Sequence, residues 1–266
     1  MNLIKTIALF ALLLGICTMG YAREQMTEAK RIYQEGEAVY ADLCNSVKEN
    51  ASAGALLPNA GSAGNTAVAG GRTEENGKIY IPEIGINFDN LSAVSGDAVA
   101  WLYCPDTVID YPVMKAEEYS YYLNHLPDGT QNANGSLFID FNNAPDFSEA
   151  LTVIYGHNMR SKMMFGSLAG YKSQGYYDEH PYMYLYTKEA NYRIELLYGC
   201  VVGAGQWRER AFMYGENAGA LIEYAAQNTT FESGAVYSEG DRIIAMSTCS
   251  YEFENARYVV IGKVSE

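Results

Sequence analysis

The sequence predicts a mainly β protein, folded as a closed barrel or a sandwich, and three observations lead to this prediction. Nine runs of the chain are short, rich in Val, Ile, Leu and Tyr, and bounded by Gly, Pro, Asn or Asp, as strands are. After residue 78 only two segments carry a helical pattern. The composition, 48% hydrophobic and 19% charged, allows a core to form. Many short strands with few helices favour a closed or doubled sheet.

The elements follow one another from residue 78 to residue 264. The predicted strands are 78–86, 98–105, 108–114, 135–140, 151–157, 182–187, 192–203, 241–249 and 257–264. One predicted helix lies near 161–171. The other lies at 215–230, where apolar residues keep helical spacing, namely Ala218, Leu221, Ile222 and Ala225.

Residues 1–22 form a predicted targeting segment. Lys5 supplies a positive start, residues 6–22 carry no charge, and Gly20 and Ala22 are small enough for cleavage after Ala22. An uncharged run of 17 residues is short for a spanning helix, so a cleaved signal peptide and an uncleaved anchor both stay open. Either one predicts that the rest of the chain is exported and works at the outer face of the cell membrane.

Two further segments precede the main domain. Residues 23–50 predict an amphipathic helix that starts near Thr27, followed by apolar residues at a mixed spacing of three and four. These apolar residues are Ile32, Val39, Tyr40, Leu43 and Val47. Residues 51–77 are rich in Ala, Gly, Ser and Asn, which is typical of a flexible linker. The predicted catalytic domain then spans 78–266.

Charge and ligand patterns exclude several classes of function. A net charge of −14 argues against nucleic-acid binding, which needs Lys and Arg to displace counterions. The His, Cys and Asp residues lack the close spacing of a zinc ligand set, and no EF-hand loop is present. We therefore expect neither a metal nor a cofactor.

The cysteines outside the targeting segment number four and lie far apart. In an exported chain they allow two disulfides with three connectivities. A domain of this size does not need such bridges, and Cys104 and Cys200 lie in apolar strands, so we predict that both are buried thiols. For Cys249 a disulfide and a buried thiol both stay open.

Three side chains form a candidate catalytic group. Cys249 ends one predicted strand and Arg257 begins the next, so a hairpin would place them at facing strand ends about 5 Å apart. His157 follows Gly156 where another apolar strand stops. A thiolate attacks carbonyl groups, a guanidinium stabilises an oxyanion, and an imidazole transfers protons. The residues alone thus indicate a cysteine acyltransferase, with the alternative that each side chain is structural.

At these residues the chain resembles the sortases, and most closely class B. The resemblance rests on ordered stretches: "DYPVM", "YYLNH", "GSLFIDFNN", "LTVIYGHNM", "MFGSL", "HPYMYLYT", "NYRIELLYG" and "STCSYEFENARYVVIGKV". Together they cover residues 78–264. The resemblance implies a barrel of about eight strands, an N-terminal helix, and a helix in the long connection before the cysteine strand.

The resemblance also implies an activity. Cys249 would cleave a C-terminal LPxTG- or NPxTN-like sorting motif after Thr, and a cell-wall precursor amine would resolve the thioester. His157 would be the general acid and base, and Arg257 would stabilise the oxyanion or the substrate. Asn124, Ser247 and Thr248 would be substrate contacts. The implied partners are surface proteins that carry the sorting signal.

This chain departs from the family pattern before the cysteine. The usual T-L-x-T-C is replaced by "AMSTC", so a threonine hydroxyl is lost at Ala245, while Met246 for Leu nearly conserves volume. Ser250 stands where some relatives have an acidic residue, which leaves motif preference open. Other readings are a sortase that joins pilin subunits, a hydrolytic cysteine peptidase, an L,D-transpeptidase, and an inactive surface-binding barrel.

Overall fold

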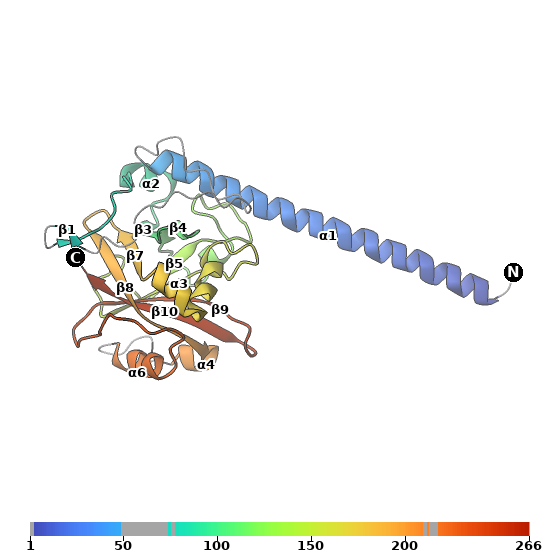
Figure 1. Cartoon of the computed structure of the whole chain (residues 1–266). Coiled ribbons are helices and arrows are strands. Elements are labelled where there is room, and N and C mark those ends of the chain that lie inside the picture. Colours follow the sequence, from blue (N-terminus) through green and yellow to red (C-terminus); the bar gives the residue numbers. More distant parts are fainter. Residues whose placement is uncertain (1–2, 49–73, 76–77, 210–211, 213–217, 266) are drawn as a thin grey trace.

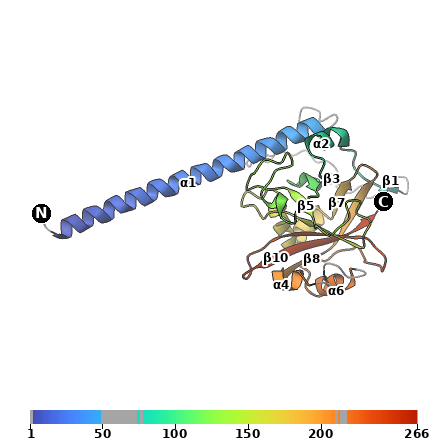
Figure 2. The same ribbon diagram turned by 180° about the vertical axis from the view of Figure 1, so that it is seen from behind.

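The computed structural model describes residues 3–48, 74–75, 78–209, 212 and 218–265. Figure 1 shows a barrel-shaped body from which one long helix, α1, projects to the N-terminus, and Figure 2 shows the same arrangement from behind.

Eight strands close into a single barrel. In sheet order they are β10 (Ala256–Ser265), β8 (Asn191–Gly203), β7 (Tyr182–Tyr186), β3 (Ala98–Tyr103), β4 (Asp110–Met114), β5 (Leu137–Ile139), β6 (Leu151–Tyr155) and β9 (Ile243–Cys249). The β4–β5 and β6–β9 pairs are parallel. Every other pair of neighbours is antiparallel. The prediction of a closed, mainly β barrel is confirmed.

The first predicted strand, 78–86, does not enter the barrel. Only β2 (Lys78–Ile79) is a strand, and it pairs with β1 (Glu74–Glu75) in a small separate sheet. Beyond it Pro82 lacks the backbone N–H that a ladder needs, and Gly85 turns the chain with a φ of 59°. The segment then leads into α2 (Phe88–Val94), whose N-terminus is capped by the Asn87 side chain.

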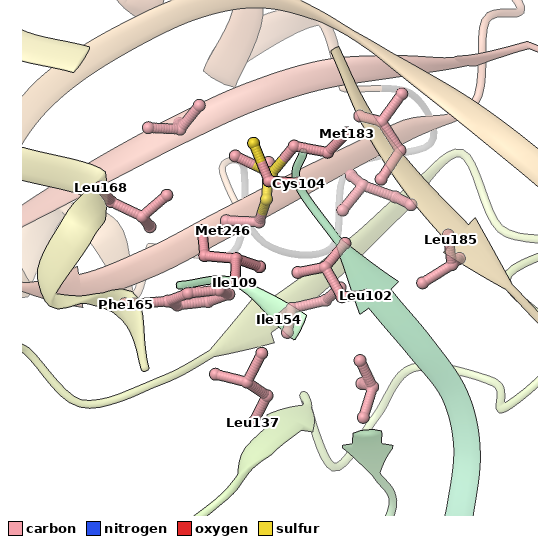
Figure 3. Close-up of a cluster of buried hydrophobic side chains, with 14 of the residues drawn as sticks. Leu102, Cys104, Ile109, Leu137, Ile154, Phe165, Leu168, Met183, Leu185 and Met246 are labelled. Carbon is pink, nitrogen blue, oxygen red and sulfur yellow. The ribbon is translucent and has the colours of Figure 1, made fainter. Parts of the chain in front are cut away.

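The sequence of β9 is an apolar run because its side chains are buried on both faces of the strand. Ile244 and Met246 belong to the cluster inside the barrel, where Met246 lies near Cys104 and Ile109 (Figure 3). Ile243 and Ala245 belong to a second cluster on the outer face, with residues of α4 (Ala204–Trp207) and α6 (Gly219–Gln227). Both faces of the strand are therefore buried.

Short helices occupy the connections. Between β4 and β5 lies the 3₁₀ helix η1 (Tyr121–Leu123), and after β6 come the 3₁₀ helix η2 (Phe165–Lys172) and α3 (Gln174–Glu179). The helix expected near 161–171 is thus present in 3₁₀ form. The helix expected in the long connection before the cysteine strand is α6, and its apolar residues Leu221, Ile222 and Ala225 are buried.

The N-terminal helix α1 (Leu3–Val47) is one continuous element. The predicted start at Thr27 is wrong, because the Thr27 hydroxyl donates 2.9 Å back to the Arg23 carbonyl instead of capping a helix end. Glycines within α1 cost only about 1 kcal/mol each and do not break it. In the described part of the chain, no helix combines the length and the apolar character needed to cross a membrane. Of the predicted linker 51–77, all but Glu74–Glu75 lies outside the described residues.

Candidate active site

Cys249 is the last residue of β9 and the first exposed residue after six buried ones. The polar connection "SYEFENA" follows. The buried part of β9 therefore ends at Thr248, and the Cys249 side chain is accessible to solvent. All five cysteines of the chain are free, which removes the disulfide reading of Cys249. Cys104 and Cys200 are buried, as predicted. Burial raises the pKa of the Cys104 thiol to about 11 and that of Cys200 to about 12, so both stay protonated at neutral pH.

Arg257 lies directly opposite Cys249. The two residues are register partners in the antiparallel β9–β10 pair, so their side chains leave the same face of the sheet. On its other side Arg257 pairs with Val202 of β8. Arg257 is half-buried, and its guanidinium donates from Nη1 to the Ala256 carbonyl at 3.0 Å. The predicted placement of the two residues at facing strand ends is confirmed.

The segment around His157 is hydrogen-bonded to the C-terminal end of β9. β6 runs parallel to β9, with Tyr155 beside Ser247. Beyond that pair, Thr248 Oγ1 donates to the Gly156 carbonyl at 2.8 Å, and Asn158 Nδ2 donates to the Cys249 carbonyl at 2.7 Å. The residues on both sides of His157 are thus bonded to the last two residues of β9, so the structure brings the His157, Cys249 and Arg257 segments together.

Gly156 is needed for close packing. A Cβ atom at this position would lie 2.4 Å from Leu137 Cδ2 and 2.7 Å from Phe165 Cδ2. Gly156 is not among the described residues with positive φ, so the glycine is not required by the backbone conformation. Its role is to let the strand end approach β5 and η2.

The ring of His157 is oriented by a backbone carbonyl. His157 Nε2 lies 2.7 Å from the Leu123 oxygen. A carbonyl only accepts, so Nε2 must carry a proton, and in the neutral ring Nδ1 is then the unprotonated nitrogen. The ring is half-buried, so this contact is partly shielded from water. The nitrogen available to accept or donate a catalytic proton is therefore Nδ1.

The three predicted substrate contacts have different surroundings. Asn124 is exposed at the end of η1, next to Leu123. Thr248 is 3% exposed and uses its hydroxyl on Gly156, so it holds the histidine segment. Ser247 is 2% exposed, and within the described residues its Oγ has no hydrogen-bond partner. Their roles toward a substrate stay predictions.

Two further residues that hold the site, Asn158 and Lys172, carry no signal in the sequence. Asn158 was unmarked although it adjoins His157. Lys172 of η2 contacts Glu252 and bonds Ser250 Oγ at 2.9 Å, so it ties η2 to the turn after Cys249. Burial opposes the charge on Glu252, but hydrogen bonds from Lys172 and Ser250 outweigh it and lower the carboxyl pKa to about 2. No sequence pattern marked this contact across 80 residues.

Among the residues that the structure describes, no group of three His, Cys, Asp or Glu side chains is arranged to hold a metal ion.

A closed barrel that places a free cysteine opposite an arginine, with a histidine segment on the neighbouring strand, defines a cysteine enzyme of the sortase type. The chain is 31% identical over 186 residues to sortase B of Listeria monocytogenes, covering 68% of this chain and 75% of that protein. No family model matches the sequence.

Solved structures give the same answer. Sortase B of Clostridium perfringens matches with a TM-score of 0.62 and 26% identity, over 67% of this chain and 100% of that chain. A Streptococcus pyogenes class B sortase involved in pilus biogenesis matches with a TM-score of 0.61 and 26% identity, over 68% of this chain and 99% of that chain. The protein therefore belongs to the class B sortase family, which are cysteine transpeptidases, and the family predicted from the sequence is confirmed.

Proposed function

We propose that this protein cleaves a C-terminal LPxTG- or NPxTN-like sorting motif after Thr and transfers the acyl fragment to a cell-wall precursor amine. The observation that carries the proposal is the meeting of three segments, in which Cys249 faces Arg257 across β9–β10 and both neighbours of His157 bond to β9. The proposed partners are surface proteins that bear the motif. In this proposal α1 directs the enzyme to the outer face of the cell membrane.

In the first half-reaction the Cys249 thiolate attacks the Thr carbonyl carbon. The carbonyl oxygen becomes an oxyanion, and the Arg257 guanidinium beside Cys249 donates hydrogen bonds to it. When the C–N bond breaks, Nδ1–H of protonated His157 gives its proton to the leaving amine. The thioester holds the acyl group, and His157 is left neutral with its proton on Nε2.

In the second half-reaction an amine replaces the leaving group. The amine nitrogen attacks the thioester carbon, and Nδ1 of His157 removes its extra proton. The C–S bond then breaks and returns the Cys249 thiolate and the imidazolium. Because the leaving amine and the incoming amine need the same proton transfer in opposite directions, one imidazole nitrogen serves both steps.

The test is a panel of motif peptides incubated with the full chain in detergent micelles and an amine acceptor. We expect a ligated product and a covalent adduct whose mass corresponds to the thioester, and we expect both to disappear in Cys249→Ala. Cys44→Ala is the matched control, because it removes another free and partly accessible thiol. Products that are hydrolysed even with amine in excess would point to a peptidase instead.

A pilin-joining activity is the second candidate, because the similar Streptococcus pyogenes sortase is involved in pilus biogenesis. The two candidates differ in the acceptor. A folded pilin domain with a reactive lysine should outcompete a cell-wall peptide amine if this chain joins pilins, and the reverse should hold if it anchors proteins to the wall.

A further inference from the structure

The C-terminal part of α1, residues 32–47, packs against the loop that leads into β5. Asn132 Nδ2 donates to the Ile32 carbonyl at 3.0 Å, and Asn134 Nδ2 donates to the Tyr33 carbonyl at 3.2 Å. Both asparagines are buried. Three residues after Tyr33, α1 carries Gly36, where a Cβ atom would lie 2.1 Å from Asn134 Nδ2. The helix and the loop therefore approach as closely as a glycine allows.

Tyr40 makes the next contact, one turn further along α1. Its hydroxyl donates to the Gly135 carbonyl at 2.6 Å and lies 3.0 Å from Ser136 Oγ. The side chain is 4% exposed, and burial raises the phenol pKa, so the hydroxyl stays protonated and remains a donor. Ser136 Oγ in turn donates to the His125 carbonyl at 2.9 Å. The phenol thus fixes the backbone of residues 135 and 136.

Gly135 connects this contact to the histidine. It adopts a φ of 58°, and a Cβ atom there would lie 2.8 Å from the Leu123 oxygen and 3.1 Å from His157 Cδ2. The same Leu123 oxygen accepts the proton of His157 Nε2. Gly135 therefore packs so close to the Leu123 carbonyl and the His157 ring that a larger side chain would not fit there.

We propose that residues 32–47 of α1 position His157, and that Tyr40 and Gly36 are the positioning residues. Tyr40 holds the backbone at Gly135, the next residue Ser136 donates its N–H to the Tyr122 carbonyl at 2.9 Å, and the adjoining Leu123 carbonyl holds the imidazole with Nδ1 free for proton transfer. This inference rests on the proposed role of His157. It makes the N-terminal helix part of the active-site support as well as a tether.

The chain offers a matched pair of glycines for the first test. Gly36→Ala and Gly20→Ala both replace a glycine within α1, so both raise helix propensity by the same amount. At Gly20 nothing lies within 4 Å of the added carbon, whereas at Gly36 the carbon meets Asn134. In full-length enzyme, we expect Gly36→Ala to lower kcat about 10-fold, as displaced catalytic groups do, with KM nearly unchanged. Gly20→Ala should match wild type, and equal kcat values for the two variants would overturn the proposal.

A matched pair of tyrosines separates positioning from general stability. Tyr40→Phe removes the bond to Gly135, and Tyr186→Phe removes a comparable buried bond, 2.7 Å long, from Tyr186 to the Pro82 carbonyl. Both variants should lose similar thermal stability. We expect Tyr40→Phe alone to lower kcat, by about 3- to 10-fold, the equivalent of one neutral hydrogen bond. Loss of kcat in both variants in proportion to their melting temperatures would show a merely structural role.

A spectroscopic measurement keeps the inference separate from the proposed reaction. In wild-type protein labelled with ¹⁵N-histidine, the His157 Nε2–H resonance is the ring signal that disappears in His157→Gln. We expect its exchange with water to accelerate about 3-fold or more in Tyr40→Phe and to stay unchanged in Tyr186→Phe. This result requires no turnover, so it would stand even if wild type transferred no acyl group. Unchanged exchange in Tyr40→Phe would refute the positioning role.

Discussion

The hairpin of Cys249 and Arg257 and the segment of His157 reach the same place by different means. In the hairpin, a continuous backbone ladder sets the pairing, and seven consecutive register pairs run from Cys249–Arg257 to Ile243–Lys263. The His157 segment lies beyond the end of its strand. It is held by separate hydrogen bonds: the Thr248 hydroxyl and the Ser247 carbonyl bond Gly156, Asn158 donates to the Cys249 carbonyl, and His157 donates to the Leu123 carbonyl.

This difference indicates which parts of the site keep their geometry when a neighbouring residue is substituted. A register shift would have to break many ladder bonds at once, so the nucleophile and the guanidinium keep their relation as long as β9 and β10 pair. The imidazole depends on several independent contacts, each worth about 1 kcal/mol. Substitutions in the hairpin should therefore act through chemistry, and substitutions around His157 should act through position.

The largest effect should come from a change of chemistry within the hairpin. Arg257→Lys keeps the charge and the β pairing but removes the planar fork of donors. If Arg257 stabilises the oxyanion, kcat should fall about 10²-fold, which is the usual cost of losing one such donor. Steady-state kinetics with a cleaved motif peptide measure it. Arg242→Lys, one residue before β9, is the control at the other end of the strand, and an equal loss in both would remove the special role of Arg257.

A smaller effect on kcat, joined to a loss of stability, should follow from displacing the histidine segment. In Gly156→Ala the new methyl overlaps Leu137 and Phe165, and overpacking of this kind costs about 1–3 kcal/mol. We expect a lower melting temperature and a kcat reduced about 10- to 100-fold, because His157 is the next residue. In Gly234→Ala nothing lies within 4 Å of the added carbon, so that variant should be silent. A destabilised Gly156→Ala enzyme with full kcat would show that the segment tolerates displacement.

The same difference explains what the sequence could predict. The hairpin lies within "DRIIAMSTCSYEFENARYVVIGKV", so alternation, a polar turn and strand spacing place Cys249 opposite Arg257 without knowledge of the rest. The barrel class followed from many short strands in the same way. Local patterns carry such information because neighbouring strands are joined by a short connection.

The support of His157 could not be predicted, since its contacts span long stretches of sequence. Leu123 lies 34 residues before His157, and Tyr40 lies 95 residues before Gly135. Neither a carbonyl oxygen nor a phenol that acts on a backbone leaves a pattern in composition or periodicity. The uninterrupted helix through Thr27 was missed for a related reason, because a threonine hydroxyl caps a helix or bonds back within one depending on its surroundings.

The smallest effect should come from the ion pair that holds the turn of the hairpin. Lys172 and Ser250 lower the pKa of the Glu252 carboxyl from an ordinary 4.5 to about 2. A depressed pKa contributes stability that is full above the unfolded value and is lost as the pH falls from about 4.5 toward 2. Because both side chains are about one-third exposed, we expect no more than about 1 kcal/mol between wild type and Glu252→Gln above pH 5, measured by urea unfolding. That difference should shrink on acidification, whereas Glu254→Gln, which changes an exposed carboxylate in the same turn, should show none. A difference that stays constant down to pH 2 would mean that the Glu252 carboxylate is not what Lys172 holds.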